Sequence, residues 1–180
     1  MLTMINMMEA VCDDLRRMFR GYTLPNKAGV LQEVRIFAQY MPQPSGITFD
    51  DKNTGLKNYT GEDFEQNFPG IIVKLGDMTD QEEQRLDMNR VSVKLLCGVY
   101  DANPVCNGWR DVAGMMEKIR QEWLKERVIA RRFRIEMPLV TRLVEADTWP
   151  VYFGEMEVMF ETGRVGRGVD YVYRGYVSNG

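Results

Sequence analysis

The most regular part of the chain reads Arg90-Val91-Ser92-Val93-Lys94-Leu95-Leu96-Cys97-Gly98-Val99-Tyr100-Asp101. Its valines and leucines, flanked by turn-forming residues, predict a β-strand. Residues 68–75 predict a partner strand, and strand-like runs near 132–136 and 151–160 follow an intervening amphipathic segment. This order predicts an α+β fold with a small, mostly antiparallel sheet, flanked by an N-terminal helix and a central amphipathic helix.

Two segments have the spacing of amphipathic helices. In residues 3–20, apolar side chains recur every three or four positions, and Gly21 ends the pattern. Residues 109–127 repeat this spacing, with Asn107 or Gly108 placed as the N-cap. The predicted apolar faces are formed by Ile5, Met8, Cys12, Leu15 and Phe19 in the first helix and by Trp109, Val112, Met116, Ile119 and Trp123 in the second.

The chain is predicted to form one domain followed by a tail. At 180 residues it is long enough for one core and too short for two ordinary domains. We predict a single α+β domain over 1–162 with a long insertion or arm at 21–67, inside which 30–40 forms one strand. The acidic stretch 76–89 does not match the spacing of a calcium-binding loop and is predicted to be a solvated hairpin connection between strands. Residues 163–180 form a Gly-, Arg- and Tyr-rich tail.

Composition and charge narrow the classes of function. The chain is 44% hydrophobic and 27% charged, with a formal net charge of −3, which is typical of a globular protein without a general affinity for nucleic acid. Its apolar runs are far shorter than the roughly 20 residues that span a bilayer, so we expect no membrane partner and assembly in the cytoplasm. Cys12, Cys97 and Cys106 are predicted to be reduced, with a Cys97–Cys106 disulfide as the alternative.

The sequence contains no histidine. This removes Ser-His-Asp and Cys-His catalysis, histidine zinc sites and the side chain that titrates nearest to neutral pH. A phosphate-binding glycine loop, a nucleophile elbow and a paired-cysteine zinc motif are also missing from the sequence. We therefore predict no catalytic residues, no cofactor and no bound metal.

Charged and aromatic clusters remain as candidate binding surfaces. Residues 127–134 carry four arginines. Arg131, Arg132 and Arg134 are candidates for a protein interface or for a surface that faces DNA or a lumen, with Arg132 and Arg134 on one strand face. Surface or interface charge is the predicted role of Glu155 and Glu157. The tail is a further candidate interface, which adds a strand to a neighbouring sheet edge or stays loose until a partner is present. Its candidate residues are Arg164, Arg167, Tyr171, Tyr173 and Tyr176.

Five blocks of sequence resemble one known family, the tail terminator (tail completion) proteins of long-tailed bacteriophages and phage-tail-like particles. The resemblance covers roughly residues 68–161, about half of the chain, and leaves out the 21–67 arm and the 163–180 tail. None of the blocks is a catalytic signature. The blocks are Phe68-Pro69-Gly70-Ile71-Ile72-Val73, Val93 to Asp101, Gly108-Trp109-Arg110-Asp111-Val112, Met137-Pro138-Leu139 and Trp149-Pro150-Val151-Tyr152-Phe153-Gly154-Glu155.

The resemblance implies a structural virion protein and no enzyme. It implies a homo-oligomeric ring, commonly a hexamer, at the head-proximal end of the tail, which stops polymerisation of the tail tube and offers a docking surface to the head. The implied partners are the tail tube protein, the head-tail connector or neck protein, the sheath protein where the tail is contractile, and DNA passing transiently through the lumen.

Two alternatives remain open from the sequence. The chain is a head-tail adaptor or a tube subunit of the same assembly, or it is a small metal-dependent nuclease or hydrolase. The second alternative would use the carboxylates of Asp147, Glu155 and Glu157 to hold a divalent metal, and it predicts a pocket that collects them.

Overall fold

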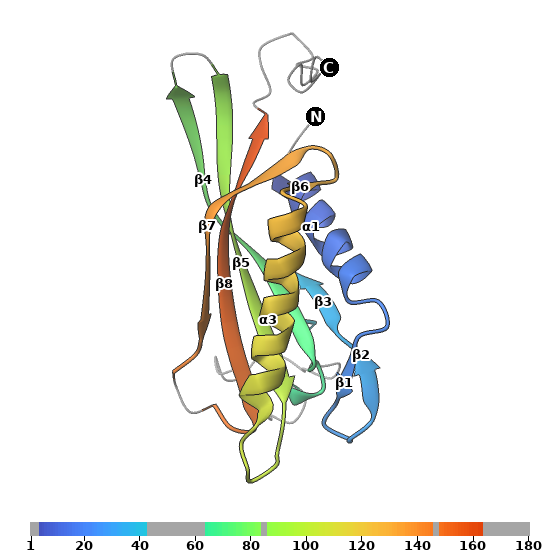
Figure 1. The fold of residues 1–180 in the computed structure, drawn as a ribbon. Coiled ribbons are helices and arrows are strands. Elements are labelled where there is room, and N and C mark those ends of the chain that lie inside the picture. The colour runs from blue at the N-terminus through green and yellow to red at the C-terminus, as the bar shows by residue number, and fades with distance from the viewer. Residues whose placement is uncertain (1–3, 43–63, 84–85, 146–147, 164–180) are drawn as a thin grey trace, which may run out of the picture.

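The structure is a computed structural model that describes residues 4–42, 64–83, 86–145 and 148–163. It has the predicted α+β architecture, because two long helices pack on one face of a curled, mostly antiparallel sheet (Figure 1). The sheet has six strands in the order β3-β4-β5-β8-β7-β6, and β1 and β2 form a separate hairpin. Within the described residues, β3 runs parallel to β4 and the other neighbouring strands are antiparallel.

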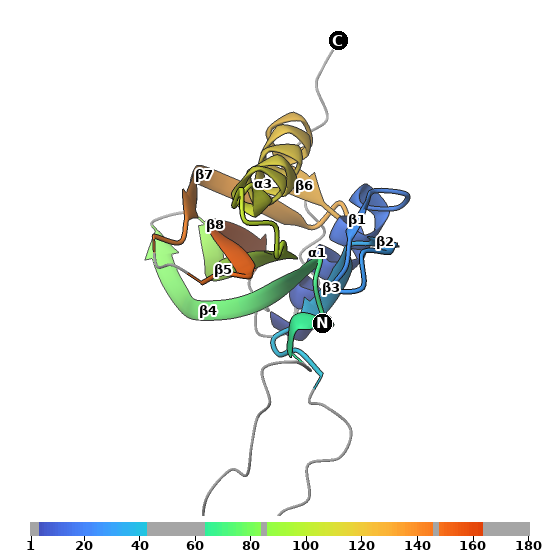
Figure 2. The same cartoon turned by 90° about the horizontal axis from the view of Figure 1, so that it is seen from below.

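The helices and strands have the following bounds. The helices are α1 (Met4–Met18) and α3 (Gly108–Lys125). The strands are β1 (Thr23–Pro25), β2 (Leu31–Glu33), β3 (Arg35–Ala38), β4 (Gly70–Glu83), β5 (Leu86–Tyr100), β6 (Val128–Ile129), β7 (Phe133–Leu143) and β8 (Val151–Gly163). Seen along the strands, β4 and β7 lie on opposite sides of the curl, and α1 and α3 close its open side (Figure 2).

Alternation along the central strands builds the core. Every second residue of β5 from Val91 to Val99 is buried, and β8 contributes Met156, Val158 and Phe160 to the same layer. Removing a Val, Leu or Phe side chain from water contributes about 1.5–3 kcal/mol each, so this layer is a main source of stability. Neither of the two long helices is apolar enough to cross a membrane.

The helices bury the predicted stripes with two exceptions. In α1 the buried residues are Met7, Met8, Val11, Cys12 and Leu15, and a left-handed Gly21 (φ +74°) follows the end of the helix. Ile5 was predicted to be buried, but it lies in the first turn, where no strand covers it, and is 67% exposed. Trp109, also predicted to be buried, is exposed at the start of α3. Asn107 is the N-cap residue, although its side chain makes no capping hydrogen bond.

The hairpin connection predicted at 76–89 does join two antiparallel strands, but most of its residues belong to the strands themselves. Strands β4 and β5 run through it as a paired ribbon, with Asp80 opposite Asn89 and Glu82 opposite Asp87. Alternating apolar and polar residues mark a strand only where one of its faces is buried. The β4–β5 ribbon extends beyond the helices that cover the sheet, so its sequence lacks this pattern (Figure 1).

The predicted arm holds more regular structure than its prolines suggest. The single strand predicted over 30–40 is instead two strands, β2 and β3, separated at the buried Val34. Strand β2 pairs with β1, whereas β3 joins the edge of the main sheet beside β4. Residues 43–63 of the arm and 164–180 of the tail lie outside the described residues.

Candidate assembly surfaces

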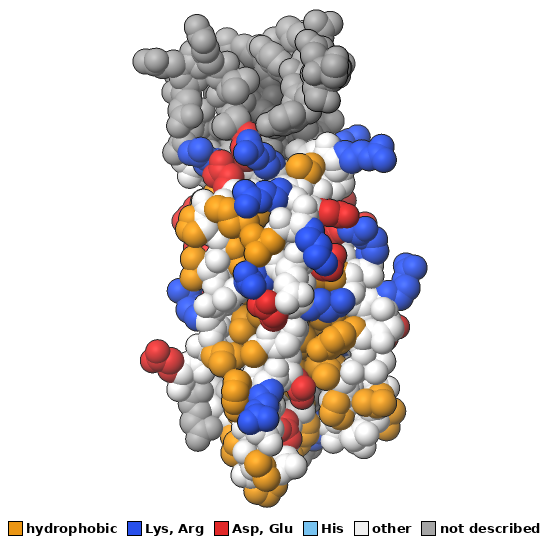
Figure 3. Space-filling model, viewed as in Figure 1, with side chains coloured by type: hydrophobic (Ala, Val, Ile, Leu, Met, Phe, Trp, Pro, Cys, Tyr) orange, Lys and Arg blue, Asp and Glu red, His pale blue; other side chains and the backbone are white. Residues whose placement is uncertain are grey.

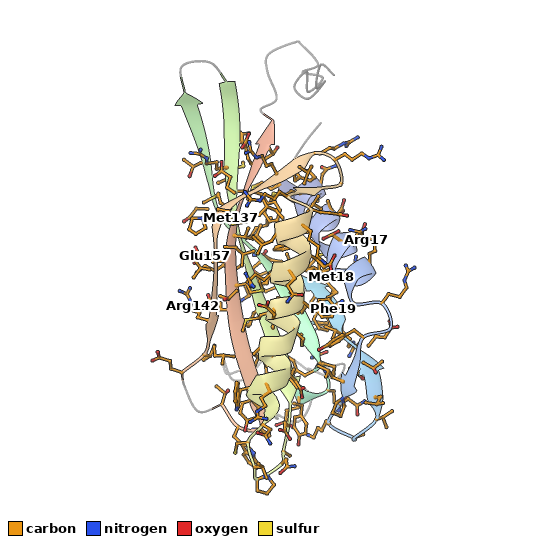
Figure 4. All side chains as sticks on the ribbon, viewed as in Figure 1. Arg17, Met18, Phe19, Met137, Arg142 and Glu157 are labelled. Atoms are coloured by element: carbon orange, nitrogen blue, oxygen red, sulfur yellow. The ribbon has the colours of Figure 1, made fainter. Side chains whose placement is uncertain are left out.

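A network of ion pairs covers part of the sheet face that points away from the helices. Arg142 of β7 contacts both predicted interface carboxylates, with 3.0 Å from its Nε to Glu155 Oε2 and 3.4 Å from its Nη2 to Glu157 Oε2. The register explains the first contact, because Arg142 lies directly opposite Glu155. Arg142 and Glu157 lie near each other on neighbouring strands (Figure 4). Lys94 Nζ is 3.7 Å from the other oxygen of Glu155. The hydrogen bond from Arg142 lowers the pKa of the Glu155 carboxyl.

This network gives Glu155 and Glu157 a different chemical setting from a metal site. Both carboxylates accept hydrogen bonds from a guanidinium, so two of their oxygens already have a cationic partner. Across the described residues, no group of three or more Cys, Asp or Glu side chains is arranged to hold a metal ion. Asp147, the third carboxylate of the hydrolase alternative, lies outside those residues.

A second row of pairs crosses the same face nearer the ribbon. Arg90 Nε lies 3.0 Å from Glu136 Oε2, and Arg134 Nη1 lies 3.8 Å from Glu161 Oε2. The Glu161 side chain is only 6% exposed, so the neighbouring positive charge offsets part of its desolvation. Arg134, predicted to face a lumen or DNA, is therefore already paired within its own sheet.

Arg131 and Arg132 lie in a tight turn between β6 and β7. The N–H of Arg132 donates to the carbonyl of Ile129 at 3.0 Å, and the two residues between them, Ala130 and Arg131, have φ of +51° and +56°. Positive φ at both central positions defines a type I′ turn, which strongly prefers Asn-Gly. The prediction that Arg132 shares a strand face with Arg134 is wrong, because the turn continues to Arg132 and β7 begins at Phe133.

Among the described residues, no anionic partner is found for the arginines of this turn or for Arg127 just before β6. Arg127, Arg131 and Arg132 are all exposed, and none of them forms an ion pair with any described residue. We call these three residues the basic turn. Lys and Arg side chains are concentrated in the upper half of the molecule as drawn in Figure 3, the half in which Figure 1 shows β6.

A hollow of about 660 Å³ separates the basic turn from α1. Its α1 wall carries Asp13 and Asp14, which are paired with Arg16 at 2.7 Å and with Arg17 respectively. Asp14 also accepts a hydrogen bond from the indole of Trp123 at 3.0 Å. Glu9 and Glu126 line the same hollow, so further carboxylates share it with Arg131 and Arg132.

The β4–β5 ribbon has the opposite charge. Residues 77–88 contain five acidic residues and one basic residue, Arg85, which gives a net charge of −4. Residues 127–134 contain four arginines and no acidic residue, a net charge of +4. We call residues 77–83 and 86–88 the acidic ribbon. It lies at the same end of the molecule as the basic turn but on the opposite side (Figures 1 and 2).

At the other end of the strands, glycines allow close contact between the sheet, Phe68 and α3. A Cβ at Gly98 would overlap the ring of Phe68, which is fully buried there and stacks edge-on to Phe153 at 5.4 Å. A Cβ at Gly154 would lie 2.6 Å from Val112 Cγ1. We call this region the glycine junction. It consists of Phe68, Gly98, Gly108, Val112, Met116, Tyr152, Phe153 and Gly154.

An exposed aromatic residue lies beside the glycine junction. Trp109 is 43% exposed, and the guanidinium of Arg110 lies 5.4 Å from the centroid of its ring. Val105 in the preceding loop is 68% exposed. The helical spacing alone could not reveal this exposure, because Trp109 falls on the predicted apolar stripe, whereas the neighbouring Gly108 is the residue buried against the sheet at the start of α3.

The three cysteines are free, so the Cys97–Cys106 disulfide is not formed. Cys12 and Cys97 are buried and Cys106 is exposed. Burial raises the pKa of the Cys97 thiol to about 12, which keeps it protonated and unreactive.

The five tail residues predicted to form an interface lie outside the described residues: Arg164, Arg167, Tyr171, Tyr173 and Tyr176. A scan against known protein families finds no match to this chain, and no curated protein matches it either.

Proposed function

We propose that this chain is a tail terminator: a subunit of a homo-oligomeric ring that caps the tail tube of a phage or phage-tail-like particle at its head-proximal end. In this role it stops tube polymerisation, provides the head-docking surface and catalyses no reaction. Assembly takes place in the host cytoplasm, and the ring remains at the end of the virion tail. Its partners are further copies of itself, the tail tube protein and the connector or neck protein.

The observation that carries the proposal is that four of the five resembling blocks meet in the glycine junction. Gly70 pairs with Gly98, Gly98 pairs with Phe153, and a Cβ at Gly108 would overlap Tyr152. The blocks are separate in sequence but form one packed unit. Their shared residues therefore serve to position α3 on the sheet, which is the task expected of a scaffold whose surfaces bind other subunits.

The charged surfaces support a binding role as well. Two of the three carboxylates on which the hydrolase alternative depends, Glu155 and Glu157, are engaged by Arg142. The arginines of the basic turn form no ion pair with any described residue. A closed ring forms when one surface of each subunit binds a different surface of the next, and the repeated rotation from subunit to subunit returns to the first. Within the described residues, the exposed arginines of the basic turn are a candidate for one such surface.

The test is a capping assay with polymerising tail-tube subunits. The chain is added at increasing ratios, and tube lengths are measured by electron microscopy. A terminator shortens the tubes and appears as a ring at one end. A tube subunit would instead lengthen them or enter along the shaft, and a head-tail adaptor would bind finished ends without changing length. If the chain occupies no position at the tube end, the proposal fails.

Copy number is measured separately by light scattering and native mass spectrometry. We expect a closed species, with six copies as the leading value. The same samples are incubated with DNA duplex and Mg²⁺ or Mn²⁺. Cleavage that is lost in a Glu155→Gln/Glu157→Gln variant would favour the nuclease alternative.

A further inference from the structure

We infer that the open edge of β7 in one subunit pairs with the open edge of β3 in the next copy of this chain, so that neighbouring sheets join edge to edge. The inference rests on the proposed function for the closure of the ring, and it names the backbone contact between subunits. The occupant of each edge is a second copy, recognised by strand pairing.

Both strands end the sheet at this level. Strand β3 is the last strand on one side of the main sheet. On the other side, β6 pairs with β7 only at Phe133 and Arg134 among the described residues, so the rest of β7 is the outermost strand there. Figure 1 shows β7 at the left border of the sheet and β3 toward its right. We call residues 140–143 the β7 edge.

The β7 edge presents backbone groups to the outside. The N–H of Val144, directly after β7, donates to the carbonyl of Phe153 on the β8 side at 3.0 Å. Successive residues of a strand direct their N–H and C=O groups to opposite sides. The backbone groups of Thr141 and Leu143 therefore point away from β8, which makes this edge a template for another strand.

Strand β3 presents an edge of the same kind. The N–H groups of Arg35 and Gln39 donate to the carbonyls of residues 69 and 73 on the β4 side, at 3.1 Å and 2.7 Å. The N–H groups of Ile36 and Ala38, which alternate with them, therefore point away from β4. Among the described residues, no strand lies beyond β3 on that side.

The two open edges match in level and direction. Following the register across the sheet, Ile36 is level with Leu143, and Ala38 is level with Thr141. Strand β3 runs parallel to β4, and each step from β4 through β5 and β8 to β7 is antiparallel, so β3 and β7 run in opposite directions. A rotation about an axis along the strands changes neither level nor direction. It therefore brings β7 of one subunit beside β3 of the next as an antiparallel pair and closes a ring without a shift along the axis.

The side chains of the β7 edge also favour a partner. Native sheets protect open edges with lysine, proline or unpaired charge. Residues 140–143 contain neither lysine nor proline, and their single charge, Arg142, is paired with Glu155. Val140 and Leu143 are 42% and 38% exposed. Pairing at the observed level would place Leu143 opposite the apolar Ile36 of the next subunit, on the same face of both sheets.

The experiment is disulfide crosslinking in the full chain. Cys106→Ser first removes the exposed native cysteine. In that background, Ala38→Cys and Thr141→Cys place thiols at exposed, level positions of the two edges, separately and together. Opposite Cα atoms of an antiparallel pair are about 4.5–5.5 Å apart, which a disulfide can span. The matched control joins Ala38→Cys to Lys125→Cys, an exposed residue of α3.

Each set of thiols has its own expected product under oxidising conditions, read by non-reducing electrophoresis and mass spectrometry. The variant with both edge cysteines should form a covalent ladder that ends at the copy number of the ring. Each single variant should stay monomeric under denaturing conditions, and a mixture of the two should give dimers and nothing larger. The control should form no ladder.

A backbone substitution provides a second measurement. Thr141→Pro removes an N–H that points away from β8, so the β7–β8 ladder keeps its hydrogen bonds while the open edge loses one. Self-association, measured by sedimentation velocity, should weaken by at least about tenfold. The matched control, Thr141→Val, retains the N–H and should associate like the wild type. Circular dichroism checks that both variants fold.

Three results would overturn the inference. Dimers of Thr141→Cys alone would show that β7 pairs with β7 across a two-fold axis. The other two are a double-cysteine variant that crosslinks no better than the control, and a folded Thr141→Pro that associates like the wild type.

The capping assay separates this contact from the proposed function. If the chain caps tubes but the edge cysteines form no ladder at the capped ends, the contact alone is wrong. If the ladder forms but the chain never occupies a tube end, the contact is supported and the proposed function is wrong.

Discussion

The glycine junction and the basic turn use glycine in opposite ways. In the junction, Gly98 and Gly154 sit where a Cβ would collide with Phe68 or with Val112, so the absence of a side chain is needed for packing. In the basic turn, Ala130 and Arg131 occupy a backbone conformation that glycine would adopt without cost, yet neither is glycine. The junction therefore uses glycine for close packing, whereas the turn places two side chains on a backbone conformation that favours glycine.

The largest test of this comparison is Gly98→Ala. The added Cβ would overlap the ring of Phe68, which has no room to move because it is fully buried against Phe153. We expect a loss of about 1–3 kcal/mol in the free energy of unfolding, the usual cost of overpacking. The measurement is urea denaturation followed by tryptophan fluorescence.

The control for this prediction is Gly114→Ala. Gly114 lies inside α3, and the nearest atom to a new Cβ is the hydroxyl of Tyr22 at 3.6 Å. Alanine in a helix interior is favoured over glycine by about 0.5–1 kcal/mol, so this variant should be more stable than the wild type. If the two variants change stability in the same direction, the packing role assigned to Gly98 is wrong.

Gly154→Ala should have a smaller effect in the same direction. Its Cβ would lie 2.6 Å from Val112 Cγ1 and 2.7 Å from Met116 Sδ. A methionine side chain can rearrange, whereas the Phe68 ring cannot, so we expect a loss of about 1 kcal/mol. The same denaturation experiment measures it. A loss larger than that of Gly98→Ala would mean that α3, and not Phe68, is the tightest contact of the junction.

The contrast between the two regions also explains what the sequence could predict. Alternation in β5 and β8 and the three-four spacing in α1 and α3 are imposed by burial, and the strands and helices inside the core were predicted from them. The acidic ribbon, the Ala-Arg turn and the exposed Trp109 lie at or beyond the edge of the core, where no burial pattern marks them. The candidate site was therefore only partly predictable: its arginines stood out by composition, but not the turn that presents them.

Ala130→Gly tests the other half of the comparison, with the opposite sign. Glycine relieves the left-handed strain at φ +51° but adds freedom to the unfolded chain, so we expect a net gain of about 0.5–1 kcal/mol. All three arginines of the basic turn are retained, so self-association should be unchanged. Thermal unfolding and sedimentation velocity measure the two quantities.

The same substitution in a helix provides the control. Ala113→Gly in α3 should lose about 1 kcal/mol, because glycine is a poor helix former. If Ala130→Gly is destabilised to the same extent, the left-handed backbone at residue 130 carries no strain that glycine relieves.

The smallest expected effect is on the pKa of Glu155. Its partner Arg142 differs from the arginines of the basic turn, because it is already paired with carboxylates. Arg142 lowers the pKa of Glu155, so the folded-state pKa lies below the unfolded value. The resulting stabilisation is present above the unfolded pKa, near 4.3, and is lost as pH falls through the folded pKa. An NMR titration of the Glu155 carboxyl from pH 6 downward should give a midpoint below the ordinary glutamate value, and Arg142→Met should raise it. An unchanged midpoint would mean that the pair seen on the sheet face does not persist in solution.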